Sequence, residues 1–564
     1  MSNLSQEKRK EMLEYINKLK EIHKDDESII ALEKIETALT EKKYGLVWEE
    51  HEEEVDKKLV HNIPVFTEVE ERKIIADENE GFNYLLEGDN LHSLKLLEKT
   101  HKGKIDVIYI DPPYNTKNKE FVYNDTRVGE DDMYRHSKWI SFMSERLLIA
   151  KELMSDEGVI FISIDDNEQA QLKILCDDIF GEKNFIANII RNTNSSKNQS
   201  LYISVSHEYC LVYSKDYEKL AVKHKDNKWE TDKNNVDEYI QKVKQLQKLG
   251  LSHEEITKEL KELTKYPRFI DFTNYWYFDE RGLYQKADLG GVKNGNKTPI
   301  INPLTNKEDP VPPGGFRYNA EKLQELIDDN RIHFHTDGSL PRLKRYLLEN
   351  KKQRPKSIMS DDQRPDYTLL KKMNIDFDNP KQLTFMKRIL GIFDENTIYL
   401  DFFAGSGTTG HAVMQLNKED GGKRKYILCT NNENKICEEV TYKRLKNIQE
   451  ELPHNLKYFK TDFTPKFTEE EDILSFRLLE HIKEMVELEN MCEIDRVNKV
   501  IVLSDEELKE KLETIKEGAY LYIPAYILLT NETKKIFEEK KLNLVEIPEY
   551  YFMDELREAK EIWF

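Results

Sequence analysis

Cysteine and long apolar runs are both scarce in this chain of 564 residues. The five cysteines stand singly, without the close pairs of a zinc site, so we expect buried, reduced thiols. No apolar run reaches the roughly eighteen residues of a membrane helix, and the first thirty residues are rich in charge. We therefore expect no membrane span, no secretory signal and a location in the cytoplasm.

Two stretches approach the pattern of a phosphate or metal site and then depart from it. Residues 290–298 nearly spell a P-loop, but Asn296 precedes the lysine and Pro299 would break the helix that must follow. His333 and His335 would share one face of a strand, yet no third ligand stands at a convincing spacing. We predict neither ATP binding nor a metal site.

Charge is unevenly distributed along the chain. Charged residues make up 34% of it, and the formal net charge is -21, which argues against contact with phosphates if it is averaged. Residues 331–390 differ, because they hold 14 Lys and Arg against 7 Asp and Glu. Half of those cations are Arg342, Lys344, Arg345, Lys351, Lys352, Arg354 and Lys356. This stretch favours a nucleic-acid surface, and the alternative is a solvated basic face balanced by acidic termini.

A buried parallel strand is predicted over Ile105–Ile110, and it leads into the loop sequence Asp111-Pro112-Pro113-Tyr114. An amino group on a nucleobase is a poor nucleophile, because its lone pair is delocalised into the ring. Asp111 and the Pro112 carbonyl can each accept an N–H from such an amine, and the prolines stiffen the loop. Tyr114 offers a flat face on which a base can stack. The alternative interpretation is an ordinary turn.

A glycine-rich turn follows a second apolar run. Residues 398–400 lead into Asp-Phe-Phe-Ala-Gly-Ser-Gly-Thr-Thr-Gly at residues 401–410, and a helix is predicted over residues 411–416. Such a turn lets the backbone approach a ligand and points helix N–H groups at it. The full dinucleotide fingerprint is absent, and the alternative is a tight turn without a ligand.

Together the two motifs resemble amino-methylating DNA methyltransferases that use S-adenosylmethionine, in the group whose catalytic motif precedes the cofactor motif. The likeness is dense over residues 85–215 and 377–442. Within the family, the chain looks most like the modification subunit of type III restriction systems. That narrower likeness lies in residues 44–49, 115–116, 121–125 and 164–168. The resemblance implies methylation of the exocyclic N6 of adenine in duplex DNA.

The resemblance also implies roles for particular residues. The catalytic motif would be Asp111, Pro112, Pro113 and Tyr114. The cofactor contacts would be Phe403, Gly405 and Gly407 beside the methionine portion, Asp401 and Lys381 nearby, and Asp89. The family often ends its next strand with an acidic residue that bonds the ribose hydroxyls. Here residues 429–432 intervene before Glu433, which we nominate for that role.

The expected fold is an α/β, Rossmann-like doubly wound methyltransferase sheet with its two halves in permuted order. Five segments are predicted: an N-terminal helical region for packing or dimerisation (1–80), a catalytic half (81–215), a target-recognition insert (216–375), a half that binds S-adenosylmethionine (376–465) and a C-terminal α/β appendage (466–564). A helix over residues 133–154 would join the catalytic strand to a strand at residues 158–164. In the insert we predict that residues 238–263 are helical and that residues 274–278 form a strand burying alternate rings. The alternative for residues 274–278 is an aromatic cluster that stacks on bases.

Three alternatives remain open. Cytosine carries an equivalent exocyclic amine at N4, so the identity of the base rests on resemblance. An RNA substrate is the second alternative, and a DNA-binding specificity protein that has lost turnover is the third. Intact Asp111, Tyr114 and both glycines argue against the third. The partners we expect are duplex DNA, a second copy of this chain as a homodimer and, for any cleavage, a separate restriction subunit.

Overall fold

The computed structural model describes residues 4–23, 25–40, 53–116, 122–123, 126–127, 134–192, 202–360, 364–466, 473–547 and 551–558. Residues 44–49 and much of residues 121–125, which carry part of the type III likeness, lie outside these ranges.

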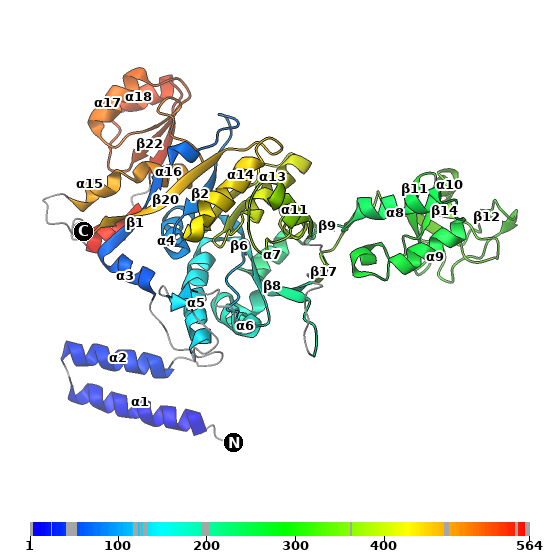
Figure 1. The fold of residues 1–564 in the computed structure, drawn as a ribbon, viewed down its shortest axis with the longest axis horizontal. Coiled ribbons are helices and arrows are strands. Elements are labelled where there is room, and N and C mark those ends of the chain that lie inside the picture. Colours follow the sequence, from blue (N-terminus) through cyan, green and yellow to red (C-terminus); the bar gives the residue numbers. More distant parts are fainter. Residues whose placement is uncertain are drawn as a thin grey trace.

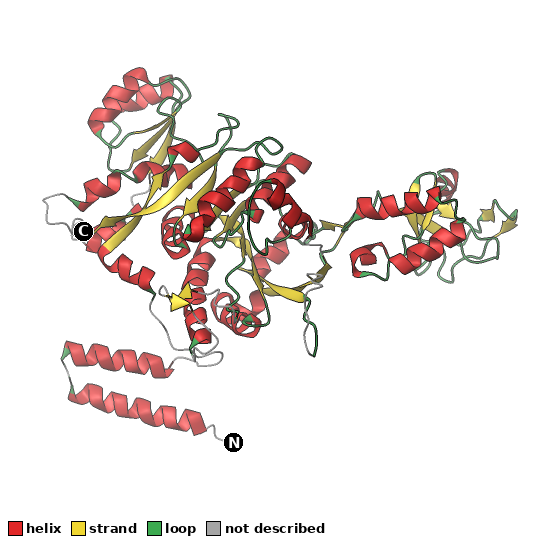
Figure 2. Ribbon diagram, in the orientation of Figure 1, coloured by secondary structure: helices red, strands yellow, loops and turns green. Residues whose placement is uncertain are grey.

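A ten-stranded sheet forms the body of the protein, with helices against it (Figures 1 and 2). Its strand order is β1-β20-β2-β19-β18-β3-β6-β8-β7-β17. In chain order the strands are β1 (Asn62–Glu68), β2 (Asn83–Glu87), β3 (Ile105–Ile110), β6 (Met154–Ile164), β7 (Phe185–Asn192), β8 (His207–Ser214), β17 (Ile358–Ser360), β18 (Ile398–Asp401), β19 (Lys425–Thr430) and β20 (Leu456–Pro465). Strands β2, β19, β18, β3 and β6 are mutually parallel, whereas β8 runs antiparallel to β6.

The chain winds outward from the centre of this sheet in both directions. Helix α5 (Arg135–Leu153) connects β3 to β6, and α13 (Thr408–Asp420) connects β18 to β19 on the other side. Strands β3 and β18 are neighbours, so the winding direction reverses between them. This topology confirms the predicted doubly wound α/β sheet with permuted halves. In such sheets ligands bind outside the carboxyl ends of the strands at the reversal point.

Alternate residues of the central strands face two separate hydrophobic cores. Ile108, Ile110 and Ile160 face one core, beneath α4 (Asn90–His101), α5, α6 (Gln169–Cys176) and α16 (Ile482–Glu489). Val107 and Tyr109 face the other core, beneath α7 (Tyr217–Lys223), α12 (Leu383–Leu390), α13 and α14 (Lys443–Asn447). A parallel strand buried on both faces is mostly apolar, which is why Ile105–Ile110 could be recognised in the sequence although it includes Asp106.

The insert projects from the body, at the right of Figure 1, on a stalk formed by β9 (Thr231–Asp232) and β16 (Lys352–Gln353). Its own antiparallel sheet has the order β10-β11-β15-β14. Its elements are α8 (Val236–Lys248), α9 (His253–Leu263), β10 (Tyr277–Asp279), β11 (Gly282–Ala287), β12 (Ile301–Asn302), β13 (Lys307–Glu308), α10 (Ala320–Asp328), β14 (Ile332–His333) and β15 (Arg342–Tyr346). Helix α11 (Arg364–Lys372) follows β17.

Three local predictions need correction. Residues 238–263 form two helices rather than one, because Gly250 adopts a φ of 73° and Ser252 starts α9 with a capping box to Glu255. The predicted strand at residues 274–278 begins only at Tyr277, since Asn274 takes a φ of 80°. The N-terminal region is not wholly helical, because Asn62–Glu68 pairs with β20 as an edge strand of the main sheet. That pairing joins residues far apart in the chain, and local pattern does not reveal it.

The two ends of the chain add smaller units. At the N-terminal end, α1 (Leu4–Ile22) and α2 (Asp26–Thr40) form a hairpin joined by the Lys20–Glu36 ion pair at 2.6 Å, and α3 (Glu54–His61) leads into β1. The C-terminal part contains α15 (Leu474–Leu479), α16, β21 (Lys499–Ile501), α17 (Asp505–Thr514), β22 (Tyr520–Pro524), α18 (Asn531–Glu539), β23 (Asn543–Ile547) and α19 (Met553–Glu558). Its three strands are parallel, and helices lie between them in the chain. Among the described helices, none is both long and apolar enough to cross a bilayer.

Candidate active site

The predicted catalytic motif begins where β3 ends, at the reversal point of the sheet. Asp111 directly follows the strand, and Pro112 is buried. The indole Nε1 of buried Trp139, on α5, donates to the Pro113 carbonyl at 2.7 Å and so holds the loop against this helix. None of the described residues donates to the Pro112 carbonyl. The loop therefore keeps the two acceptors that the sequence predicted, Asp111 and the Pro112 oxygen.

Asn115 ends the loop in a left-handed conformation, with a φ of 53°. Its side-chain amide donates to Glu168 Oε1, and His136 Nδ1 lies 2.6 Å from the same oxygen. Burial raises the pKa of Glu168 to about 8, although the Asn115 hydrogen bond opposes this shift. The contact ties the residue after Tyr114 to the start of α6, and both partners belong to segments of the type III likeness.

The Tyr114 hydroxyl lies among charged groups. It is 2.9 Å from Asp111 Oδ1 and 3.2 Å from Glu208 Oε2, and Lys381 Nζ donates to it. Lys381 Nζ also lies 3.0 Å from Asp111 Oδ1 and 2.9 Å from Glu208 Oε2. Burial, followed by the charges of Asp111 and Glu208, raises the pKa of Tyr114 well above its usual value, so the hydroxyl keeps its proton.

Lys381 therefore connects the two halves of the site. Its ammonium contacts Asp111 and Tyr114, whereas its backbone carbonyl accepts from Thr408 Oγ1, at the start of α13, at 3.5 Å. The sequence interpretation put Lys381 beside the cofactor. In the structure the charged end of the side chain points to Asp111 and Tyr114, and only the backbone lies at the glycine turn.

The glycine turn begins at Asp401, the last residue of β18, whose carboxyl group is buried. Asp401 Oδ1 accepts from the Phe403 N–H at 3.0 Å, and Oδ2 accepts from the Thr409 hydroxyl. Burial raises the pKa of Asp401 to about 7, against these two hydrogen bonds, and the charge of Asp111 adds to the rise. Asp401 thus closes the turn onto itself and lies close enough to Asp111 for their charges to interact.

Two positions of the turn require glycine. Gly405 and Gly407 have φ angles of 50° and 73°, in the left-handed region that other residues rarely adopt. A Cβ at Gly407 would also lie 3.2 Å from Thr441 Cγ2. The Gly405 carbonyl accepts from Thr441 Oγ1 at 2.6 Å, which holds the loop against the next segment. A bare backbone held in this way fits a ligand that the main chain must approach closely.

A buried arginine braces the same turn. Arg444, on α14, donates to Thr408 Oγ1 at 2.8 Å and to Ser406 Oγ at 3.1 Å. Its pKa falls to about 10 because it is buried, and no carboxylate among the described residues forms an ion pair with it. Neither Arg444 nor Trp139 was assigned to the site from the sequence, since a cation or indole on a helix carries no local sign of the loop that it supports.

The remaining nominated residues lie less directly at the turn. Asp89 caps α4 by accepting from the Leu91 N–H at 2.8 Å, and the next residue, Asn90, donates to the Phe402 carbonyl at 2.9 Å. Glu433 is exposed, and no hydrogen bond or ion pair joins it to the described residues of the turn. The structure thus brings together the catalytic motif, Lys381, Asp401 and the glycines, but leaves Glu433 outside this hydrogen-bonded group.

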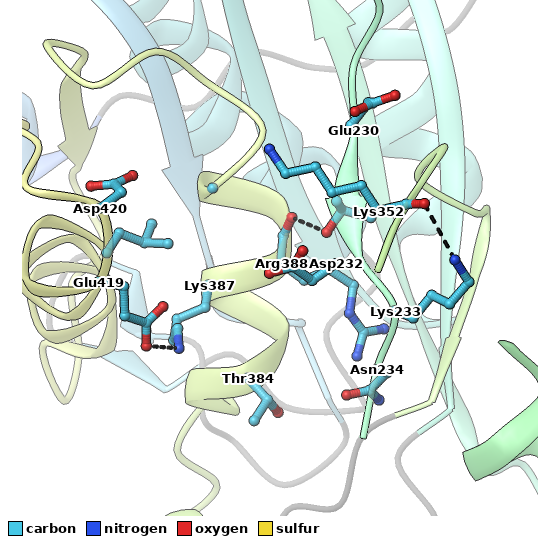
Figure 3. A pocket seen from close by; sticks show the side chains of 13 residues that line it. Glu230, Asp232, Lys233, Asn234, Lys352, Thr384, Lys387, Arg388, Glu419 and Asp420 are labelled. Carbon is cyan, nitrogen blue, oxygen red and sulfur yellow. Dashed lines mark hydrogen bonds and ion pairs between the residues drawn. The ribbon is translucent and has the colours of Figure 1, made fainter. Parts of the chain in front are cut away.

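A cavity of about 390 Å³ lies away from these loops, between the stalk and α12 and α13 (Figure 3). Its lining contains both basic and acidic side chains, and Lys387 pairs with Glu419 there. Thr231 Oγ1, on the stalk, donates to the Arg388 carbonyl at 3.2 Å. None of the predicted site residues lines it. The cavity marks the junction of insert and body rather than the candidate active site.

Comparison with known families identifies the class of this protein. A family model described as DNA methylase matches residues 105–442, more than half of the chain, and the match includes both loops. The chain belongs to this DNA methylase family, which confirms the resemblance drawn from its motifs.

Individual relatives narrow the likeness. The chain is 33% identical over 442 residues to the type III restriction-modification enzyme EcoP15I Mod subunit of Escherichia coli, covering 70% of this chain and 65% of that protein. It is 33% identical over 370 residues to the type II methyltransferase M.KpnI of Klebsiella pneumoniae, covering 63% and 82%. The chain thus spans somewhat less than two thirds of the Mod subunit. Among solved structures, a putative DNA modification methylase of Thermus thermophilus is 12% identical, covers 67% of this chain and 97% of that chain, and has a TM-score of 0.30.

Proposed function

We propose that this protein transfers a methyl group from S-adenosylmethionine to the exocyclic N6 of adenine in duplex DNA. The observation that carries the proposal is the meeting of two loops at one edge of the sheet. Asp111 and Asp401 end the neighbouring parallel strands β3 and β18, which puts an acceptor loop beside a bare glycine turn. Membership of the DNA methylase family and the names of the Mod subunit and M.KpnI support the same activity.

The catalytic loop would act by positioning and electrostatics. Asp111 and the Pro112 carbonyl accept the two N–H groups of the target amine, which returns electron density to its nitrogen and aims the lone pair. The target base leaves the duplex and stacks on the Tyr114 ring, which requires unpairing at a cost of a few kcal/mol. The nitrogen would form its new bond to the methyl carbon as the carbon–sulfur bond of the sulfonium breaks and leaves its electron pair on sulfur. The methylated amine would then release one proton to solvent.

The glycine turn would hold the cofactor. S-adenosylmethionine supplies an electrophilic methyl group on a sulfonium sulfur. We assign Phe403, Gly405 and Gly407 to contacts with its methionine portion, with Asp401 and the Lys381 backbone nearby. Asp89 and Glu433 are assigned as further contacts, Glu433 at the ribose. The left-handed glycines support this assignment, because without a Cβ they let a ligand approach the main chain closely.

We further infer that this chain is the modification and specificity subunit of a type III restriction-modification system and that it acts on DNA in the cytoplasm. The insert would recognise the target, and its basic residues would contact phosphates. A second copy of this chain and a separate restriction subunit are the proposed protein partners. The alternative activity is methylation of cytosine at N4, since the same two acceptors suit that amine.

The test is transfer of a labelled methyl group to unmethylated duplex DNA, followed by separation of the nucleosides. We expect methyladenine from the wild type, and about a 100- to 1000-fold loss in Asp111→Ala, because one acceptor of the reacting amine is gone. Asp156→Asn is the control, since Asp156 is exposed on the surface and pairs with Lys219. Label in methylcytosine would contradict the assignment of adenine as the target base. Label in structured RNA alone would contradict DNA as the substrate. DNA binding without methyl transfer would favour a specificity protein that has lost turnover.

A further inference from the structure

Four charged groups from separate segments surround the Tyr114 hydroxyl. Asp111 follows β3, Glu208 lies on β8, Arg191 lies on β7 and Lys381 precedes α12. Glu208 Oε2 lies 2.9 Å from Lys381 Nζ and 3.3 Å from Arg191 Nη1, and Arg191 is 2% exposed. Two acids and two cations balance one another at the place where the target amine must bind.

The protein's own donors compete with the target amine for Asp111. Lys381 Nζ and the Tyr114 hydroxyl both contact Oδ1, whereas none of the described residues donates to Oδ2. An ammonium held against one oxygen draws electron density from the whole carboxylate. Asp111 is therefore a weaker acceptor for an incoming N–H when Lys381 and Tyr114 are both fully committed to it.

Glu208 competes for the same two donors. The Lys381 ammonium is almost equidistant from the two carboxylates, at 3.0 Å from Asp111 and 2.9 Å from Glu208. Tyr114 has one hydroxyl proton, so it donates to Asp111 or to Glu208 but not to both at once. Whatever strengthens the hold of Glu208 on these donors releases Asp111.

We propose that Glu208 is a positioning residue that draws the Lys381 ammonium and the Tyr114 hydroxyl away from Asp111, which frees this carboxylate to accept the target amine. The inference rests on the proposed methyl transfer, and it moves the charged end of Lys381 from the cofactor to the target base. Burial opposes ionisation of Glu208, but the charges of Lys381 and Arg191 lower its pKa to about 2, so it stays charged at any working pH.

A charge-deletion cycle tests this role. Glu208→Gln keeps the shape of the side chain and removes the charge, so Lys381 pairs with Asp111 alone. We expect single-turnover methyl transfer to slow by about 10- to 100-fold, with the affinity for S-adenosylmethionine unchanged. Adding Lys381→Gln removes the competing ammonium, and the double variant should transfer methyl groups about tenfold faster than Glu208→Gln. A purely structural role for Glu208 predicts no such rescue.

Thermal melting of the wild type, Glu208→Gln, Lys381→Gln and the double variant, without any ligand, supplies a readout that does not depend on catalysis. We expect the two substitutions to be non-additive in melting temperature, because they remove the two ends of one ion pair. A normal rate for Glu208→Gln, a double variant no faster than Glu208→Gln, or additive melting shifts would overturn the inference. Failure of the proposed function would appear in the wild type, as no transfer to any duplex, while the melting cycle would still report on the shared ammonium.

Discussion

At the scale of single residues, the buried carboxyl group of Asp401 makes the site sensitive to pH. It is 2% exposed, and its pKa rises from 3.8 to about 7 because burial disfavours the charged form. Below about pH 4 the group is protonated in both the folded and the unfolded chain. As the pH rises towards 7, the unfolded chain loses a proton that the folded protein keeps, so the stability that Asp401 contributes is lost over this window.

We predict that Asp401→Asn removes this pH dependence. The full effect is on the order of 4 kcal/mol, so the melting temperature of the variant relative to wild type should rise between about pH 4 and 7 and then level off. Melting curves at four pH values over this range measure it. The matched control is Asp378→Asn at an exposed position, whose difference from wild type should be flat. A difference for Asp401→Asn that is independent of pH would contradict the prediction.

At the scale of elements, a buried charge cluster fastens the C-terminal part to the main sheet. Lys457, on β20, is fully buried and lies 2.8 Å from Glu68 on β1 and 2.7 Å from Glu487 on α16. Glu487 is also fully buried. Since Glu68 lies 389 positions from Lys457 in the chain, their contact depends on the complete fold.

We predict that Lys457→Met destabilises the protein by about 3–5 kcal/mol, because it leaves buried carboxylates without their cation. Urea unfolding followed by circular dichroism measures the loss as a lower midpoint. Lys265→Met, in the exposed Lys265–Glu262 pair, should leave the midpoint unchanged. Replacing Lys457 and Glu487 together by apolar residues should recover part of the loss. A Lys457→Met variant as stable as the wild type would show that the cluster does not stabilise the contact between the C-terminal part and the main sheet.

At the scale of the whole molecule, the insert has hydrophobic cores of its own, separate from those of the body. Its two hydrophobic clusters draw only on residues 236–347, whereas the cores beneath the main sheet draw almost entirely on other parts of the chain. The two ends of the insert meet in the stalk, where the Lys233 N–H donates to the Lys351 carbonyl at 2.8 Å.

We therefore predict that residues 234–350 can be replaced by a short Gly-containing turn that joins Lys233 to Lys351. The shortened protein should keep S-adenosylmethionine binding, measured by calorimetry, because the glycine turn lies in the body. Its affinity for duplex DNA should fall and become less dependent on salt, since Arg342, Lys344 and Arg345 are removed while Lys351 and the cations after it remain. Unchanged DNA affinity would contradict the assignment of the insert to target recognition.

Local sequence was enough to predict the centre of the fold. The apolar runs before Asp111 and Asp401 mark strands buried on both faces, and the strand-helix rhythm implies a doubly wound sheet. The break between α8 and α9 was missed, although Gly250 and Ser252 signal it locally. Strand β1 was missed for a different reason, because its partner β20 lies far along the chain.

The sequence by itself determined the two loops of the site and the family to which the chain belongs, since strand, turn and helix signals lie within short stretches. Only the tertiary structure decided which side chains from other segments contact these loops. Lys381 contacts Asp111, Tyr114 and Glu208 because strands β3 and β8 and the segment before α12 converge at one edge of the sheet. Electrostatic coupling depends on distances of a few ångströms between groups that are far apart in sequence, and spacing along the chain does not encode those distances.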